Sequence, residues 1–186
     1  MKKIILSLVL ISTAFVATET KAQKNVIKTN ILSPALYSGS ISFEHAFNWA
    51  MSYEVGISYT PATEISNIYT NGVQELSGYS ATIGLRKYRK KNAPDGFYFG
   101  PYLRHQNITL KEEDVSATIT VSSAGIKTGY QFIINEVFSV DIFYGSGVGM
   151  YEISAAETLD DINSTFGSGK IVSGAATYGF NIGFAF

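Results

Sequence analysis

The sequence predicts an all-β protein: an eight-stranded antiparallel up-and-down transmembrane β-barrel with a polar, filled interior. Two observations predict this fold. Apolar and polar residues alternate with a period of two along eight segments, which is the pattern of strands with two unlike faces. The connections between the segments alternate between short turns and longer stretches, as an up-and-down meander requires. A chain of 186 residues suits one such domain and does not favour two.

The first 22 residues have the layout of a secretory signal peptide. Two lysines precede an apolar run over residues 4–16, and Thr20 and Ala22 supply the small residues of a signal-peptidase site. The run is shorter than the roughly 20 residues that a membrane-spanning helix needs, so an anchor that stays attached is the weaker alternative. We therefore expect residues 1–22 to be cleaved and residues 23–186 to form the barrel.

Composition limits the function classes. The chain has no cysteine, which excludes a disulfide framework and a lipid-anchored cysteine, so stability must have another source, such as a closed hydrogen-bond network. The formal net charge of −1 gives no support for nucleic-acid binding. No stretch after the leader reaches the roughly 18 consecutive apolar residues that mark a transmembrane helix.

Eight segments are expected to be strands: 25–32, 38–46, 50–59, 78–88, 96–106, 123–133, 138–150 and 177–186. Between them we expect alternating connections, the mostly longer ones at 33–38, 60–77, 108–118 and 154–171 and the short ones at 46–49, 89–95 and 134–137. Short turns and both termini then lie at one end of the barrel, and the longer loops lie at the other.

The polar face of the strands indicates which side meets solvent. This face is rich in glycine and serine, whereas glycine in a water-exposed strand weakens the strand and packs nothing. A narrow lumen explains the small residues, because an eight-stranded barrel has room only for side chains. The opposite face is aromatic and aliphatic and carries no acidic residue at strand centres, as lipid contact requires. A soluble lipocalin-like binder, with the faces reversed, is the architectural alternative.

Charged residues on the predicted lumen face form the main candidate site. An isolated charge in a confined, low-dielectric interior costs several kcal/mol, so these groups are expected to pair. We expect an interior charge network that fills and fixes the lumen, and a gated ion path through the same groups is the alternative. The network comprises Lys28, Glu44, Glu54, Arg86, Arg104, Lys127 and Asp141.

The chain ends on TYGFNIGFAF, in which large apolar residues alternate with small or polar ones. With the leader and the eight amphipathic segments, this end resembles the small outer-membrane β-barrel proteins of gram-negative bacteria, of the OmpX type and the transmembrane domain of OmpA. The resemblance implies a location in the cell outer membrane and contact with its lipid and lipopolysaccharide. It also implies an assembly signal for the barrel assembly machinery, carried here by Tyr178, Phe180, Ile182, Phe184 and Phe186.

The resemblance implies a monomer with a structural or surface-interaction role through its extracellular loops, without catalysis, cofactor or metal. An extracellular ligand would bind the loops at 60–77, 108–118 and 154–171. A narrow or gated pore and an outer-membrane lipid-modifying enzyme are the alternatives. Outer-membrane lipid A deacylases use a His-x-Ser pair, but neither His45 nor His105 has that serine, and their spacing suits no metal site.

Overall fold

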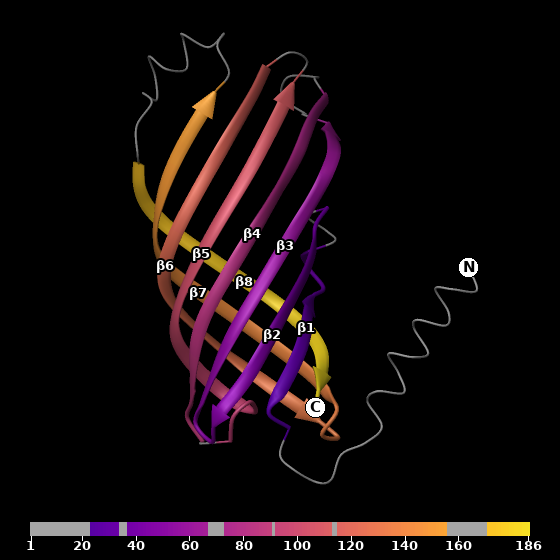
Figure 1. The fold of residues 1–186 in the computed structure, drawn as a ribbon, viewed down its shortest axis with the longest axis vertical. Coiled ribbons are helices and arrows are strands. Elements are labelled where there is room, and N and C mark those ends of the chain that lie inside the picture. The colour runs from indigo at the N-terminus through magenta and orange to yellow at the C-terminus, as the bar shows by residue number, and fades with distance from the viewer. Residues whose placement is uncertain (1–22, 34–36, 67–72, 91, 113–114, 156–170) are drawn as a thin grey trace, which may run out of the picture.

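The computed structural model describes residues 23–33, 37–66, 73–90, 92–112, 115–155 and 171–186 (Figure 1). Each strand pairs antiparallel with the next along the chain, and the last pairs with the first, so the prediction of eight antiparallel strands in one closed ring is confirmed. The strands are β1 (Asn25–Asn30), β2 (Gly39–Asn48), β3 (Met51–Ser66), β4 (Val73–Tyr88), β5 (Gly96–Glu112), β6 (Val115–Ile134), β7 (Phe138–Ala155) and β8 (Ile171–Ala185).

The predicted signal peptide, residues 1–22, lies outside the described residues, as do residues 156–170 of the last predicted loop. Among the residues that are described, there is no helix with the length and hydropathy to span a membrane.

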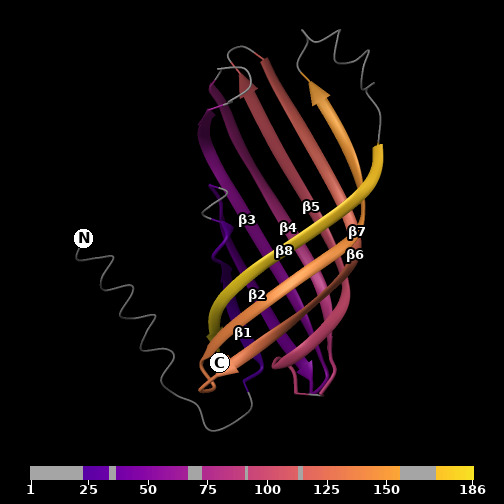
Figure 2. The same cartoon turned by 180° about the vertical axis from the view of Figure 1, so that it is seen from behind.

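The ring closes at the end where the short turns lie. The backbone N–H of Asn25 donates to the carbonyl of Phe186 at 3.0 Å, and the N–H of Phe186 donates to the carbonyl of Asn25 at 2.9 Å. Figure 2 shows the C-terminus at this end of the ring, beside the start of β1. The last residue therefore joins the same hydrogen-bonded seam that pairs β8 with β1.

Two predicted loops are wrong in their bounds. Most of residues 60–77 belong to paired strands, since β3 runs to Ser66 and β4 starts at Val73. Most of residues 108–118 likewise belong to the paired strands β5 and β6.

On β3 a register shift between Thr60 and Thr63 interrupts the alternation. On β5 the alternation continues with the faces exchanged, since the apolar Ile108 and Leu110 lie at inward positions, although the pairing continues. Cross-strand hydrogen bonds, such as that between the Thr109 and Thr118 hydroxyls at 3.2 Å, support it.

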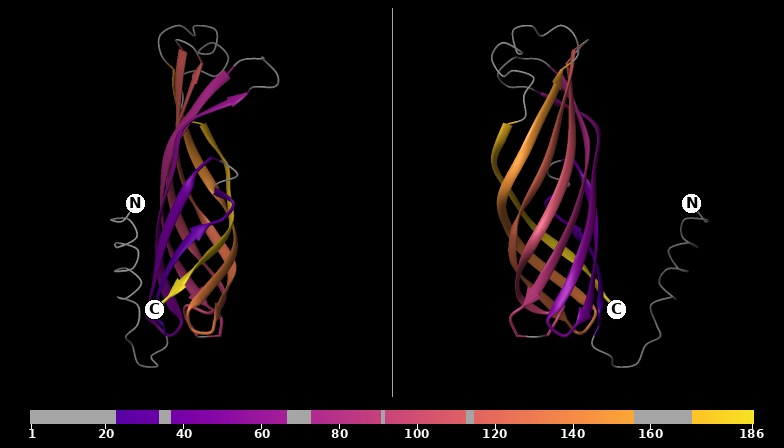
Figure 3. Two further views of the ribbon diagram at one scale, coloured as in Figure 1. Left: turned by 90° about the vertical axis from the view of Figure 1, so that its right-hand side faces the viewer. Right: turned by 60° about the vertical axis from the view of Figure 1, so that its left-hand side comes forward.

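The wall of the ring has an uneven height. β1 has 6 residues and β2 has 10, whereas β6 has 20. Figure 3 shows the ends of β3 to β6 standing above the ends of β1 and β2. The loop end of the lumen is therefore bordered by tall strands on one side and by the β1–β2 connection on the other.

Residues that alternate along each strand lie alternately on the outer and the inner face of the ring. On β7 the side chains of Ile142, Tyr144 and Val148 are half exposed or more on the outer face, whereas Ser139 and Asp141 are buried on the inner face. On the other strands most large apolar side chains also lie outward. The buried charges and most glycines lie inward, together with a few large side chains such as Tyr88, Tyr98 and Tyr102.

Two inward glycines show why small residues are needed. A Cβ atom at Gly129 would lie 2.6 Å from the Tyr98 hydroxyl, so this glycine makes room for a lumen side chain. A Cβ atom at Gly147 would instead overlap the backbone carbonyl of Ala124 on the neighbouring strand. Lumen packing and close approach of strands both select glycine here.

Candidate functional site

Six of the seven predicted lumen charges meet in one cluster near the short-turn end of the ring, which we call the charge cluster: Lys28, Glu44, Glu54, Arg86, Lys127 and Asp141. Each comes from a different strand and lies at an inward position of that strand. All six side chains are buried. The seventh, Arg104, lies elsewhere and is described below.

Strand register explains why cations gather at this level. Glu44 and Glu54 lie directly opposite each other on β2 and β3. Like charges in that arrangement repel and destabilise the sheet. Two cations lie against both carboxylates. The Nζ of Lys28 is 2.6 Å from Glu44 and 3.3 Å from Glu54, and the guanidinium of Arg86 is 3.1 Å and 2.5 Å from them.

Asp141 on β7 completes the arrangement. Its Oδ2 lies 3.3 Å from the Nζ of Lys28 and 3.1 Å from Nη2 of Arg86, so these two cations contact all three carboxylates. The third cation, Lys127, lies 2.8 Å from Glu54 and 4.8 Å from the centre of the Phe143 ring. Three cations and three carboxylates give the charge cluster a formal charge of zero.

Neutral side chains satisfy the remaining carboxylate oxygens, and charge-based reasoning missed them. The hydroxyl of Tyr88 donates to Glu44 at 2.6 Å, and that of Tyr98 donates to Asp141 at 2.8 Å. Ser52, Gln131 and Asn181 add further hydrogen bonds to the charge cluster. All five occupy inward positions by strand parity, so the period-two pattern could have found them.

The short-turn end is closed beneath the charge cluster. The amide nitrogen of Gln131 donates to the carbonyl of Pro94 at 2.8 Å, which ties the cluster to the β4–β5 turn. Val26, Ala46 and Ala185 are also buried at this end of the lumen. The half of the ring nearer the short turns, which we call the lower half, is therefore filled by hydrogen-bonded and apolar side chains. The half nearer the loop end is the upper half.

Arg104 does not join the charge cluster, so the prediction that all seven charges form one network is wrong for this residue. Its neighbour across the β4–β5 ladder is Thr82, four residues along β4 from Arg86. At about 3.3 Å per residue, this separation amounts to about 13 Å along the strand, in the direction of the loop end. Its Nη1 donates to the Thr177 hydroxyl on β8 at 3.3 Å.

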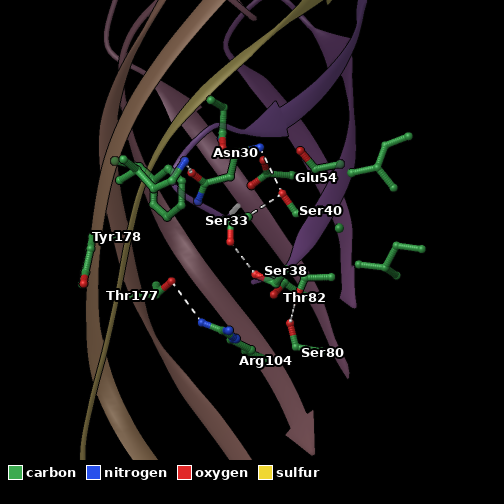
Figure 4. Close-up of a pocket in the computed structure, with 18 of the residues that line it drawn as sticks. Asn30, Ser33, Ser38, Ser40, Glu54, Ser80, Thr82, Arg104, Thr177 and Tyr178 are labelled. Carbon is green, nitrogen blue, oxygen red and sulfur yellow. Dashed lines mark hydrogen bonds between the residues drawn. The ribbon is translucent and has the colours of Figure 1, made fainter. Parts of the chain in front are cut away.

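A cavity of about 260 Å³ lies in the lumen between the charge cluster and the loop end (Figure 4). Its floor includes Glu54 and Lys127, and Arg104 and Thr177 lie on its wall. Serine and threonine hydroxyls line much of the rest: Ser33, Ser38, Ser40, Ser42, Ser58, Ser80 and Thr82. A second space of about 190 Å³ shares Arg104 and continues toward the loop end.

The two histidines lie outside this site. Nδ1 of His45 is 2.8 Å from the side-chain oxygen of Asn25, and Nδ1 of His105 is 3.0 Å from the Ser122 hydroxyl. In the described part of the chain, no carboxylate hydrogen-bonds to the His105–Ser122 pair. No set of three or more His, Asp or Glu side chains among the described residues is arranged to hold a metal ion.

The residues of the predicted assembly signal lie on β8 and at the chain end. Tyr178, Ile182, Phe184 and Phe186 are exposed on the outer face, and Phe180 is partly exposed. The ring of Phe184 packs against that of Phe138, with centroids 5.4 Å apart. The signal residues are thus grouped on one strand face, apart from the charge cluster.

Fold and site together define a class: a closed barrel of eight antiparallel strands that buries a charge-balanced cluster. Residues 5–157 match the model of a family described as "Protein of unknown function (DUF3575)". Since the match covers most of the chain, the protein belongs to this family. A comparison with curated proteins finds no match, and a comparison with solved structures finds none.

Proposed function

We propose that the protein is exported to the outer membrane of a gram-negative cell and spans it as a barrel with a filled, polar interior. The observation that carries this proposal is the outer surface. Ile57, Ile83, Leu103, Ile126 and Val148 are between 53% and 60% exposed at the middle of their strands. Soluble monomers rarely expose contiguous apolar patches of more than a few hundred Å², whereas a lipid-facing barrel surface requires an apolar band.

Charged residues on the outer face support the same proposal by their position. Lys87 lies on the outer face near the β4–β5 turn, and Glu152 lies near the opposite end of β7. Between them, the described outward positions carry no Asp, Glu, Lys or Arg. A basic residue at the bilayer midplane would cost about 2 to 4 kcal/mol, so charges at the two ends fit a membrane-spanning band.

The filled lower lumen favours a structural or surface-interaction role over a pore. The charge cluster is neutral and lies between the cavity and the short-turn end, so an ion path would require its members to exchange partners. The cavity is therefore a pocket closed at its base. In this role the longer loops at the opposite end present the surface that meets partners.

The proposed partners follow from this placement. The outer face contacts outer-membrane lipid and lipopolysaccharide, and the barrel assembly machinery reads the signal from Tyr178 to Phe186. The seam between Phe186 and Asn25 supports the second point, because the residue that ends the signal also closes the ring.

Fractionation of expressing cells tests the proposal. We expect the protein in the outer-membrane fraction, resistant to urea and carbonate, and released only by detergent. On SDS gels the unheated sample should migrate differently from the heated one, since a closed barrel resists SDS until it is heated. Recovery from the periplasm without detergent would contradict membrane insertion and favour the soluble lipocalin-like binder.

Two further measurements separate the alternatives. A flat current trace from the protein in a planar lipid bilayer supports a sealed lumen, and stable conductance steps would support the pore. Unchanged lipid A in an overexpressing strain supports a role without catalysis, and a modified acyl pattern would support the enzyme.

A further inference from the structure

Arg104 differs from the other lumen cations in having no carboxylate partner. Lys28, Arg86 and Lys127 each lie within 3.3 Å of at least one carboxylate oxygen. Among the described residues, no carboxylate oxygen lies within 4.0 Å of the Arg104 guanidinium, whose hydrogen bond is the one from Nη1 to Thr177. Its Nε is buried without a hydrogen-bond partner. Arg104 is half-buried, and a cation withdrawn from water without a counter-charge is costly, which favours an anion or a polar ligand beside it.

The geometry of the guanidinium points to the kind of ligand. Arginine binds carboxylates, phosphates and sulfates by donating hydrogen bonds from neighbouring N–H groups of its guanidinium. The described contact of Arg104 uses Nη1, and no described residue accepts a hydrogen bond from Nη2, whereas Nε is enclosed by the protein. The Nη end of the guanidinium, and not Nε, is therefore the part that is free to donate to a ligand. It lies beside the hydroxyl-lined cavity, where Ser80, Thr177 and Arg104 come from three different strands (Figure 4). Hydroxyls on several sides suit a tetrahedral oxyanion.

The charge of the cavity agrees with an anion. Arg104 and Lys127 line it with positive charge, and Glu54 is the one acidic lining residue in the described part of the chain. Both oxygens of Glu54 are already engaged, Oε1 by Lys28 and Arg86 and Oε2 by Lys127. The lining thus carries a formal excess of one positive charge.

We propose that Arg104 and the surrounding hydroxyls form a binding site for a phosphate- or sulfate-type oxyanion that enters from the loop end. Pockets for drug-sized ligands measure roughly 300–1,000 Å³. The cavity of about 260 Å³ is smaller and holds a small anion or the terminal anionic group of a larger molecule. The charge cluster closes the inner end of the site, so the ligand binds in a pocket without an exit. The site does not depend on membrane insertion.

The test is titration of the purified full-length protein in a nonionic detergent, followed by calorimetry. One arm uses inorganic phosphate, and the other uses mixed micelles containing a lipid with a phosphate monoester headgroup. Saturable binding in the first arm identifies a free oxyanion as sufficient. Binding in the second arm alone identifies a headgroup. Absence of binding in both arms would overturn the proposal.

Matched variants locate the site. Arg104→Met should weaken binding at least tenfold, whereas Lys87→Met, which removes a cation from the outer face, should leave it unchanged. Thr177→Val and Ser80→Ala keep every charge and should each weaken binding several-fold, which keeps the test decisive if Arg104→Met fails to fold. Unchanged affinity in Arg104→Met, or equal loss in Lys87→Met, would contradict the proposal.

Discussion

Two arginines of the lumen, the buried Arg86 and the half-buried Arg104, occupy opposite environments. Arg86 lies against three carboxylates in the lower half of the barrel and stacks on Tyr98, with its Cζ 4.1 Å from the ring centre. Arg104 lies in the upper half with one hydrogen bond to Thr177 and a hydroxyl-lined cavity beside it. Strand parity places both in the lumen, but only one has a counter-charge.

This difference teaches that the level along the barrel axis, as well as the face of the strand, decides the role of a lumen charge. At the level of Arg86, the register brings Glu44, Glu54 and Asp141 together from three strands. At the level of Arg104, the neighbouring inward positions are Thr82 on β4 and Ser123 on β6. Among the described residues, each cation of the charge cluster in the lower half thus has a carboxylate partner, whereas Arg104 in the upper half has none.

The largest effect expected from this comparison is that of Arg86→Met. The substitution leaves three buried carboxylates facing two lysines, and breaking a buried ionic arrangement of this kind costs about 3 to 5 kcal/mol. We expect the free energy of unfolding in detergent, measured by urea titration of the heat-modifiable band, to fall by that amount.

Arg104→Met is the matched control for stability. It removes a guanidinium that has one described hydrogen bond and orphans no carboxylate, so the free energy of unfolding should stay within about 1 kcal/mol of the parent. Equal losses of unfolding free energy in Arg86→Met and Arg104→Met would contradict the difference between the lower and upper halves of the barrel.

A smaller effect is expected when Arg104 is given a counter-charge. Thr82 lies directly across the β4–β5 ladder from Arg104, so the carboxylate of Thr82→Asp would be within reach of the guanidinium. The internal ion pair should compete with an added anion and lower phosphate affinity about tenfold, or 1.4 kcal/mol. Thr82→Asn, of similar shape without charge, should lower it less. Equal affinities in the two variants would argue that the anion does not bind at Arg104.

The smallest effect concerns a neutral member of the lower half. Tyr98→Phe removes the hydroxyl that donates to Asp141 at 2.8 Å, and the free energy of unfolding should fall by about 1 to 3 kcal/mol at most, since the carboxylate keeps its other partners. Tyr79→Phe, at an outward ring that is 55% exposed, should have no measurable effect. A larger loss in Tyr79→Phe would contradict the assignment of inner and outer faces.

The sequence supports prediction of the fold more fully than prediction of the site. Period-two alternation suffices to place Lys28, Glu44 and Asp141 inside and the aromatic residues outside. The strand ends at 60–66 and 107–112 were missed for two reasons. A register shift between Thr60 and Thr63 interrupts the alternation on β3, and on β5 the apolar Ile108 and Leu110 lie on the inward face, opposite to the pattern of the strand centre. The isolation of Arg104 depends on the stagger between strands, which follows from closure of the whole ring and is not visible in any single segment.

The central claim, that the apolar outer face contacts lipid, is tested most directly by single-cysteine labelling, since the chain has no cysteine of its own. We predict that Ile142→Cys and Val148→Cys in proteoliposomes react slowly with a charged, water-soluble maleimide. Ser154→Cys, at an exposed outward position of β7 beyond Glu152, should react quickly. Rapid labelling of all three positions, equal to that of the urea-denatured protein, would contradict a lipid-facing surface.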